Sequence, residues 1–397
     1  MTATAQEKPA QAQQPAAAGP PVPVAGIIDV RDSRAFIRTA GYRAGRDDVA
    51  VTQSQLRQYG LRPGDLVEGT ARPPRQDGAS QRQGRARPGS RVLAGLDTVN
   101  GRPAAQARNR PHFAQLTPLF PQDRLRLDAG PASPAARIID LVTPVGKGQR
   151  GLIVAPPKAG KTMVLQALAA AVAASHPEVH LMVVLVGERP EEVTEMQRTV
   201  RGEVIYSTFD QPAADHIMIA ELAAERAKRL AELGGDVVML LDSLTRLARA
   251  YNLAAPSSSR ILTGGVATSA LQGPRRFLGA ARNTEEGGSL TILSSALVET
   301  GSAMDNVFFE EFKGTGNMEL RLRRDLAEKR LYPAVDVAAS STRRDDLLMP
   351  ADEHAAVTRL RRALAGLEPQ QALDMLLAKT RETATNPEFL LQLRRSA

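Results

Sequence analysis

The residues of this chain best suited to chemistry lie in the segment APPKAGKT, residues 155–162. A glycine-containing turn that ends in lysine and threonine can hold phosphate oxygens with backbone N–H groups and a helix N-terminus. Lys161 would reach the β- and γ-phosphates of a nucleotide, and the Thr162 hydroxyl would bind Mg²⁺. Ala155 stands where glycine is usual, which is a mild departure. The segment predicts a site for ATP and Mg²⁺.

Two carboxylates that follow later apolar runs could complete this site. Asp242 stands where a carboxylate would orient Mg²⁺ through its water shell; alternatively it caps the next helix, a role that Ser243 could share. Glu188 is the candidate for the group that positions and polarises the attacking water. Glu191 and Glu192 fit better in the first turn of a helix, where acidic residues suit the helix dipole.

Alternating strands and helices are needed to bring these groups to one edge of a sheet. Near-continuous apolar runs favour buried strands at 150–155, 179–187, 236–242 and 289–297. Helical patterns are expected at 161–175, 190–201, 214–233, 243–252, 356–367 and 371–380. This alternation is typical of an α/β fold with a mostly parallel sheet and helices on both faces, whose chemistry collects at the carboxyl ends of the strands.

The first part of the chain has a different sequence pattern. Short β-type runs separated by Gly, Pro and Asp predict a small all-β barrel, with runs at 26–30, 35–39, 48–52, 65–71 and 91–96. One connection, residues 72–91, is rich in arginine. It could be a solvated flexible loop or a loop that contacts phosphates, and the sequence favours neither.

Changes of composition set the predicted domain boundaries. An Ala-, Gln- and Pro-rich segment at 1–25 is expected to be disordered, because it cannot bury enough apolar surface. The barrel would occupy 26–102, a Pro- and Arg-rich linker 103–135, and the nucleotide-binding α/β domain with a helical C-terminal part 136–397.

Charge and composition narrow the class of function. The formal net charge of +8 suggests a polyanionic partner such as nucleic acid, although a generally basic surface is the alternative. The absence of cysteine excludes disulfides, thiolate zinc sites and a cysteine nucleophile. No apolar run suits a secretory signal or a membrane span, so we expect a cytoplasmic protein without membrane partners.

Several longer motifs together resemble the Rho family of transcription termination factors. They are VAPPKAGKT, ERPEEVTEMQR, LLDSLTRLARAYN, LTGGV, RRFLGAARNTEEGGSLTI and EEFKGTGNMEL, and the resemblance runs from about residue 26 to the C-terminus. It implies a RecA-like P-loop ATPase domain preceded by an OB or cold-shock-type barrel. It also implies a homohexameric, RNA-dependent ATPase and RNA–DNA helicase that acts on nascent single-stranded RNA and the RNA polymerase complex. The helical subdomain that precedes the barrel in that family is expected to be absent.

The resemblance assigns roles around the nucleotide. Glu188 would be the catalytic carboxylate and Asp242 the Mg²⁺-orienting aspartate. Arg343 would be an arginine finger donated by a neighbouring subunit, Arg330 a second phosphate-sensing arginine, and Tyr332 an aromatic that stacks on adenine. The residues implied to line the nucleotide are Gly146, Lys147, Gly148, Gln149, Arg150, Gly151, Lys158, Ala159, Gly160, Lys161, Thr162, Met163 and Arg189.

The resemblance also implies two loops that pull RNA through the centre of a ring. One lies within 260–268, with Thr263, Gly264, Gly265 and Val266 as its RNA contacts. The other lies within 299–305 and comprises Thr300, Gly301, Ser302 and Ala303. The family's usual lysine of this second loop is Ala303 here, which removes a phosphate contact. The residue before Glu188, usually acidic in the family, is Gly187 here, so the electrostatics beside the catalytic group should differ.

An outer RNA site is implied on the barrel. Phe36 and Arg38 match its motif, Asp48 matches a polar base contact, and Arg34 replaces the first aromatic. Other barrel aromatics of the family fall on Ala50 and near Arg91. Each lost base platform should weaken stacking by about 1–3 kcal/mol. We hypothesise that the arginine-rich connection compensates through phosphate contacts, which would make binding less selective and more salt-sensitive.

Two other functions fit parts of the pattern. A rotary or secretion ATPase of the same RecA-like class also has a small barrel before its ATPase domain, but its turnover would not need RNA. A non-catalytic RNA-binding scaffold would hydrolyse no nucleotide, which the presence of Lys161, Glu188, Asp242 and Arg343 disfavours.

Overall fold

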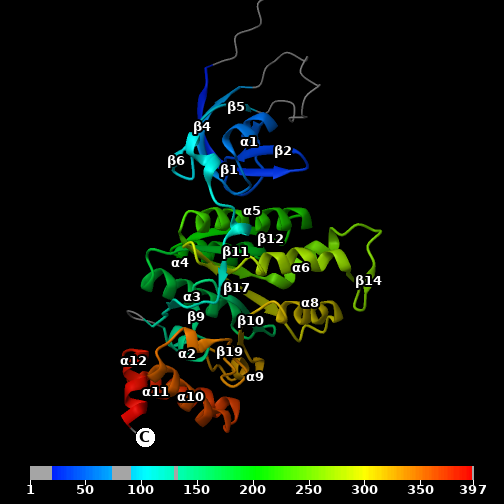
Figure 1. Cartoon of the computed structure of the whole chain (residues 1–397). Coiled ribbons are helices and arrows are strands. Elements are labelled where there is room, and N and C mark those ends of the chain that lie inside the picture. The colour runs from blue at the N-terminus through cyan, green and yellow to red at the C-terminus, as the bar shows by residue number, and fades with distance from the viewer. Residues whose placement is uncertain (1–19, 74–90, 129–132, 396–397) are drawn as a thin grey trace, which may run out of the picture. The chain divides into compact units, whose positions relative to one another are not determined.

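The computed structural model describes residues 20–73, 91–128 and 133–395, which belong to two compact units (Figure 1). The described residues up to Arg62, together with Leu66–Arg108, form the first unit. Pro63–Asp65 and the described residues from Asn109 onward form the second. The arginine-rich connection falls mostly outside the described residues, and so does most of the segment at 1–25.

The first unit is a closed five-stranded barrel, which confirms the predicted OB-like fold. Its strands are β1 (Val22–Arg31), β2 (Arg34–Arg38), β3 (Val49–Val51), β4 (Leu66–Arg72) and β5 (Arg91–Val99), followed by the short β6 (Arg102–Pro103). Neighbours are antiparallel except β3 and β5, whose parallel pairing closes the barrel. Helix α1 (Gln53–Tyr59) joins β3 to β4 and begins with a capping box between Thr52 and Gln55.

Strand alternation builds the core of the barrel. Ile28, Ile37, Val49 and Val67 each have 0% exposure and point inward from four strands. Strand β1 starts four residues before the predicted first run, because its first six residues pair with β4, from Val22 opposite Ala71 onward. The last residues of the segment expected to be disordered are therefore part of the barrel.

The second unit has a mostly parallel sheet, as its apolar runs predicted. In order across the sheet, the strands are β12 (Glu203–Thr208), β11 (His180–Glu188), β13 (Asp236–Asp242), β17 (Ser289–Leu297), β10 (Arg150–Ala155), β18 (Met318–Arg321) and β19 (Ser341–Thr342). The first six are parallel and β19 is antiparallel. Two short strands, β16 (Arg282–Thr284) and β7 (Pro118–Leu119), extend it through antiparallel pairing with β17 and with each other.

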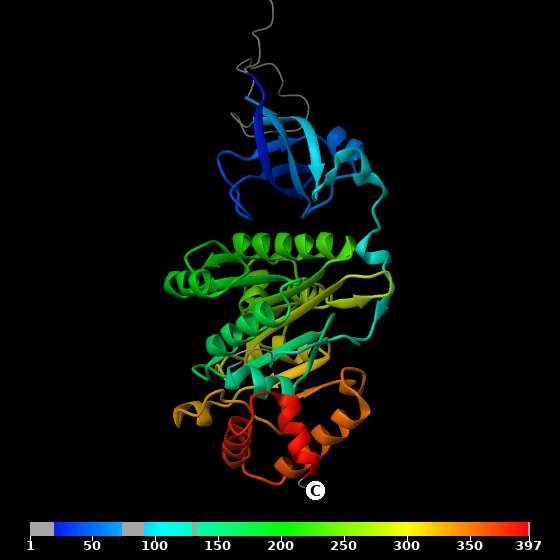
Figure 2. The ribbon, with the colours of Figure 1, turned by 90° about the vertical axis from the view of Figure 1, so that its left-hand side faces the viewer.

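Helices cover both faces of this sheet, which buries the central strands almost completely (Figures 1 and 2). The helices near the nucleotide motifs are α3 (Lys161–Ser175), α4 (Pro190–Thr199), α5 (Ala213–Glu232) and α6 (Leu244–Leu253). Those after them are α7 (Gln272–Leu278), α8 (Ala303–Lys313), α9 (Arg324–Glu328), α10 (Ala351–Ala365), α11 (Pro369–Arg381) and α12 (Asn386–Arg395). In the described part of the chain no helix is both long and apolar enough to cross a membrane.

The segment expected to be a linker contains ordered elements in its described part. Short helices at Ala104–Asn109 and Phe113–Gln115 are followed by β7 and by β8 (Arg124–Leu125), which pairs with β9 (Val145–Gly146). The next helix, α2 (Pro134–Val142), starts with Ser133 as its N-cap. This segment therefore adds strands to the second unit, and the sequence-based boundaries stay predictions.

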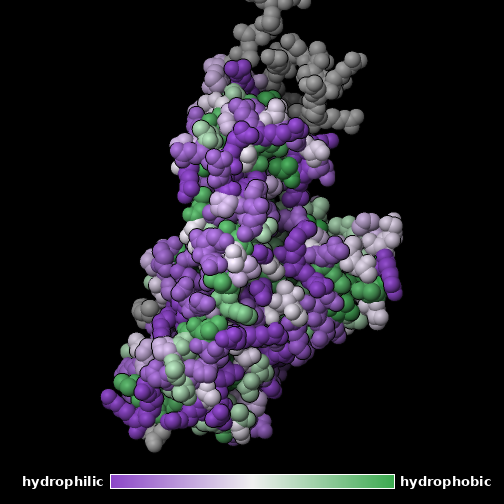
Figure 3. Space-filling view, in the orientation of Figure 1, coloured by the Kyte–Doolittle hydropathy of each residue, from purple (hydrophilic) through white to green (hydrophobic). Residues whose placement is uncertain are grey.

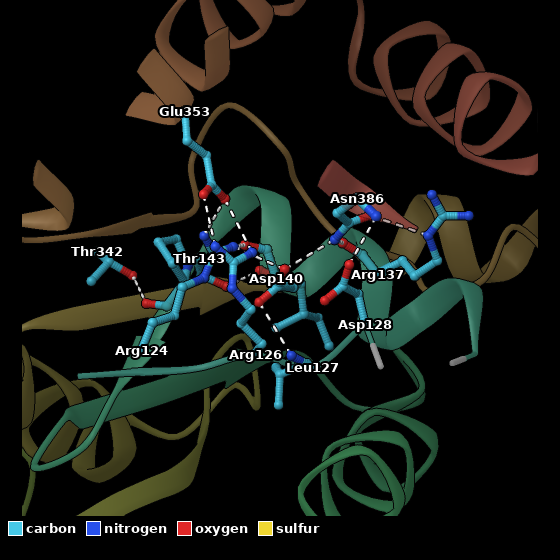
Figure 4. A network of polar contacts seen from close by, with 12 residues as sticks. Arg124, Arg126, Leu127, Asp128, Arg137, Asp140, Thr143, Thr342, Glu353 and Asn386 are labelled. Atoms are coloured by element: carbon cyan, nitrogen blue, oxygen red, sulfur yellow. Dashed lines mark hydrogen bonds and ion pairs between the residues drawn. The ribbon is translucent and has the colours of Figure 1, made fainter. Parts of the chain in front are cut away.

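A buried polar network joins the start of the second unit to its C-terminal helices (Figure 4). Asp140 in α2 accepts hydrogen bonds from Arg124 at 2.8 Å and from the Asn386 amide at 3.0 Å. Arg137 donates to the Asn386 carbonyl oxygen at 3.1 Å. Arg124 also reaches Glu353 of α10 at 2.6 Å. The network holds α10 and α12 against α2 and β8.

Candidate nucleotide site and nucleic-acid surfaces

The phosphate-binding segment has the strand–turn–helix context that its chemistry requires. Strand β10 ends at Ala155 and α3 begins at Lys161. Lys158 and Gly160 have positive φ angles of 65° and 87°. A Cβ atom on Gly160 would lie 3.1 Å from the ring of Tyr332, so glycine is needed there. Ala155 is fully buried as the last strand residue, so its methyl group lies in the core and leaves the turn itself unaltered.

The predicted catalytic groups converge at the carboxyl ends of adjacent strands. Lys161 donates to Glu188 Oε1 at 3.1 Å and also to Asp242. Glu188 and Asp242, which end β11 and β13, are each 2% exposed. The Ser295 hydroxyl, on the neighbouring strand β17, donates to Asp242 at 2.8 Å. Ser243 rather than Asp242 caps α6, since its hydroxyl accepts from the Arg246 N–H, so the helix-cap alternative does not describe Asp242.

Burial and charge act in opposite directions on these groups. Burial alone would lower the pKa of Lys161, but Asp242 and Glu188 outweigh it, so the pKa is raised and the lysine stays charged. Burial raises the pKa of the Asp242 carboxyl, Lys161 opposes this shift and the nearby Glu188 adds to it. A compact site with one cation between two buried carboxylates is suited to exchange that cation's contacts for phosphate oxygens.

Arg246 is a member of the site that sequence reasoning missed. Its guanidinium lies 3.1 Å from Glu188 Oε2 and also donates to the Gly187 carbonyl oxygen. Gly187 has a φ of 66° and stands where the pairing of β11 with β12 is irregular. The only sequence signal for Arg246 was its position one helical turn after Asp242. Ser295 could have been found from its place near the carboxyl end of a strand.

The other predicted nucleotide residues divide between two edges of the sheet. Lys158 and Met163 are exposed beside the turn, and Arg189 is exposed at the N-cap of α4. Tyr332 lies against Gly160, and exposed Arg330 precedes it by two residues. These side chains surround the edge that carries Lys161. Their contacts with a nucleotide stay predictions.

The segment Gly146–Gly151, predicted to line the nucleotide, lies elsewhere. It leads into β10 at Arg150, about 16 Å of strand away from Ala155. Lys147 pairs with Asp236 at 2.6 Å, and the fully buried Gln149 donates to Asn317. Within one chain the length of β10 separates this segment from the phosphate-binding turn, and its contacts with a nucleotide stay a prediction.

Arg343 also lies at the far edge. It follows β19, and its backbone N–H donates to the Asn317 carbonyl at 2.9 Å, where β10 and β18 begin. Its side chain is exposed. Arg343 cannot reach the phosphates of its own chain, a geometry that agrees with donation to a neighbouring copy; this role stays a prediction.

The two predicted RNA loops lie side by side and are held by α6. Asn252 donates to the Gly265 carbonyl at 3.1 Å and accepts from the Ala267 N–H at 2.7 Å. A Cβ atom on Gly264 would lie 3.0 Å from the Ala303 carbonyl oxygen. Arg249 donates to Asp305, as does the Thr300 hydroxyl at 2.6 Å.

Not every residue of these loops is free to meet RNA. Val266 is fully buried in β15 (Val266–Ala267), which pairs with β14 (Ile261–Leu262), so its side chain is not exposed and its contact with RNA stays a prediction. Ser302 caps α8, while Thr263 and Ala303 are exposed. Leu253 and Ile261 are also exposed, and Figure 3 shows hydrophobic residues gathered on the side of this unit that carries β14.

Three of the four barrel residues predicted to bind RNA line one hollow of about 290 Å³, whose lining is Asp29, Arg31, Asp32, Arg34, Phe36 and Arg38. Arg38 is only 8% exposed and forms ion pairs with Asp29 and Asp48. Its guanidinium carbon lies 5.3 Å from the Phe36 ring centre. Arg38 and Asp48 thus have each other as partners inside the barrel, whereas Arg34 is exposed at its rim.

Comparisons with known proteins agree with both units. Residues 24–104 match the Rho termination factor, RNA-binding domain family, and residues 135–342 match the ATP synthase alpha/beta family, nucleotide-binding domain. A transcription termination factor Rho from Streptosporangium roseum is 58% identical over 393 residues, which cover 97% of this chain and 98% of that protein. The chain belongs to the Rho family of transcription termination factors.

Other Rho proteins and two solved structures extend this comparison. Rho factors from Streptomyces lividans and Micrococcus luteus are each 60% identical over 94% and 93% of this chain, which spans about half of their own length, 52% and 54%. A type III secretion ATPase aligns with a TM-score of 0.60 at 21% identity, covering 77% of this chain and 94% of that one. The ATP synthase subunit NeqB aligns at 0.57 and 17%, covering 70% and 76%. These two structures share the RecA-like fold alone with this Rho-family chain.

Proposed function

We propose that this chain is an RNA-dependent ATPase and RNA–DNA helicase that binds nascent transcripts, moves along them and terminates transcription. The names of its Rho-family relatives support termination, and the two matched domains support RNA and nucleotide binding. Because nascent transcripts are made in the cytoplasm of bacteria, we propose that location for it.

One observation carries the RNA dependence. Helix α6 holds a catalytic group and both RNA loops: Arg246 lies 3.1 Å from Glu188, Arg249 bonds Asp305 at 2.9 Å, and Asn252 bonds Gly265 at 3.1 Å. A helix is a stiff element, so a shift of the loops on RNA would reach Glu188 through Arg246. A secretion-type ATPase, whose turnover does not depend on RNA, would not need this connection.

The residues of the site suit phosphoryl transfer to water. Glu188 would accept a hydrogen bond from the attacking water and polarise it, while Lys161 would neutralise charge on the transferring phosphoryl group. Thr162 and Asp242 are the oxygen donors that fit Mg²⁺, an ion that usually keeps several waters and is completed by substrate phosphates. The described residues hold no group of three or more acidic or histidine side chains that could hold a metal alone, which fits such a shared site.

We propose further that six copies form a ring in which Arg343 acts on the neighbouring copy's nucleotide. Its place at the far edge of the sheet from Lys161 supports this. The test mixes two variants, Lys161→Ala and Arg343→Ala, that should each be inactive alone. Mixed rings contain some interfaces with both residues intact, so activity should reappear on mixing. Arg343→Ala with full activity, or mixtures as inactive as the separate variants, would contradict donation between copies.

The function itself is tested by ATP hydrolysis without nucleic acid and then with poly(C), poly(U), mixed-sequence RNA and single-stranded DNA. Strong stimulation by RNA is expected. The ratio of poly(C) to mixed RNA reports how far Arg34 and the arginine-rich connection have relaxed base choice, and a steep salt dependence is expected if phosphate contacts compensate. Equal turnover with and without RNA would favour the rotary or secretion-type ATPase, and no hydrolysis under any condition would favour a scaffold. A transcription assay with the polymerase complex tests termination.

A further inference from the structure

Gly187 precedes the candidate catalytic carboxylate and lies next to the side chains of Arg246 and His216. A Cβ atom at this position would lie 3.4 Å from Cδ and 3.8 Å from Nη1 of Arg246, and 3.8 Å from Nε2 of His216. The guanidinium and the imidazole nitrogen therefore face the same small volume. Arg246 is also the residue that contacts Glu188 Oε2. Arg246 therefore connects His216 to Glu188, the group expected to activate water.

The surroundings of His216 favour its neutral form. Its Nδ1 lies 2.6 Å from the Ser207 hydroxyl of β12, and it stands in the first turns of α5, where the helix dipole opposes a positive charge. Burial lowers the pKa of His216, Arg246 lowers it further, and Asp215 and Asp210 partly oppose them. An imidazole that donates from Nδ1 to the Ser207 hydroxyl presents an unprotonated Nε2 toward the guanidinium.

We propose that His216 is a positioning residue for the hydrolytic step: its neutral imidazole, oriented by Ser207, keeps the Arg246 guanidinium against Glu188. This rests on the proposed ATPase function. Protonation would place a second cation beside Arg246 and push the guanidinium away from Glu188. Arg246 would then no longer orient the carboxylate for its water, while the phosphates remain held by residues 155–162.

The proposal predicts a specific pH dependence. Because the pKa of His216 is lowered from its ordinary value, the neutral form persists at neutral pH, and the positioning effect is lost only as the pH falls through that lowered value. The loss should appear in kcat and not in KM, since His216 and Arg246 do not belong to the phosphate-binding turn. A carboxylate placed at residue 187 would lie between the Arg246 guanidinium and the His216 imidazole. It would stabilise the protonated imidazole and so move the loss of kcat to higher pH.

The test compares pH profiles of RNA-stimulated ATP hydrolysis for the full chain, His216→Gln, Gly187→Asp and a control, His354→Gln, on the distant helix α10. His216→Gln, which cannot titrate, should lose the acid limb of kcat, and Gly187→Asp should move that limb to higher pH; aspartate tolerates the φ of 66° better than most residues. The control should match the parent chain. Unchanged acid limbs in both variants would overturn the proposal.

A double-mutant cycle separates positioning from a general structural effect. His216→Ala should lower kcat about 5- to 10-fold at neutral pH, within the range of coupling between neighbouring side chains, and less than about 2-fold when Arg246→Ala is already present. Equal effects in both backgrounds would mean that His216 does not act through Arg246. If the parent chain itself hydrolyses no ATP with any RNA, the proposed function fails and this inference falls with it.

Discussion

Asn252 offers a direct test of how RNA reaches the catalytic site. Replacing it with alanine removes the donor to the Gly265 carbonyl and the acceptor for the Ala267 N–H, at 3.1 and 2.7 Å. Each neutral hydrogen bond contributes about 1 kcal/mol, so the ordered loop loses about 2 kcal/mol of stabilising free energy. This is equivalent to about 30-fold in the population of the ordered loop. Asn252→Ala should therefore raise the RNA concentration for half-maximal ATPase stimulation by up to about 30-fold.

A matched variant sharpens this test. Asn252→Asp keeps the acceptor for the Ala267 N–H but loses the amide donor, so its effect should be about 5-fold. ATP binding without RNA, measured with a fluorescent nucleotide, should change in neither variant, because Asn252 is nearly two turns of α6 away from Arg246. The reasoning is refuted if Asn252→Ala responds to RNA like the parent chain. It is equally refuted if ATP binding without RNA falls to the same extent.

Three further results are expected. Lys161→Ala should lower kcat at saturating RNA by about 100-fold or more, since one charged donor to the phosphoryl group is lost; a smaller drop in steady-state assays would contradict its role. Arg38→Ala should destabilise the protein by about 3–5 kcal/mol in urea unfolding, because buried Asp48 loses the Arg38 cation and buried Asp29 keeps Arg31 but loses Arg38. A loss below about 1 kcal/mol would show that the two carboxylates do not depend on Arg38. Glu353→Gln should lower stability more at pH 7 than near pH 3. Burial raises the pKa of Glu353, but Arg126 and Arg124 outweigh burial and lower it, so the stabilisation is present above the ordinary carboxyl range and is lost as the pH falls through the lowered value. Urea midpoints at the two pH values measure this.

The positions of the candidate catalytic groups could be predicted because their signals are local. An apolar run that ends in a carboxylate identifies both the strand and its functional end, so Glu188 and Asp242 were found without any contact information. The same holds for Lys161, whose turn lies between a strand and a helix. The strands of the barrel could also be predicted from short alternating runs, although β1 begins at Val22, before the predicted run.

The residues that sequence reasoning missed or misplaced depend on contacts between distant segments. Arg246 and Ser295 matter because β11, β13 and β17 are neighbours in the sheet, an order that no local pattern reveals. The burial of Val266 follows from its pairing in a two-stranded ribbon, which its loop motif does not reveal. The ion pair between Arg38 and Asp48 forms because the closed barrel brings two separate segments together.

The three contacts of α6 also constrain how this family can vary. Residues 246, 249 and 252 are spaced by three, so they stand on successive turns of one helix. Inserting or deleting one residue between them would rotate Asn252 by about 100° and shift it by about 1.5 Å. Natural and engineered relatives should therefore tolerate no change in the length of α6.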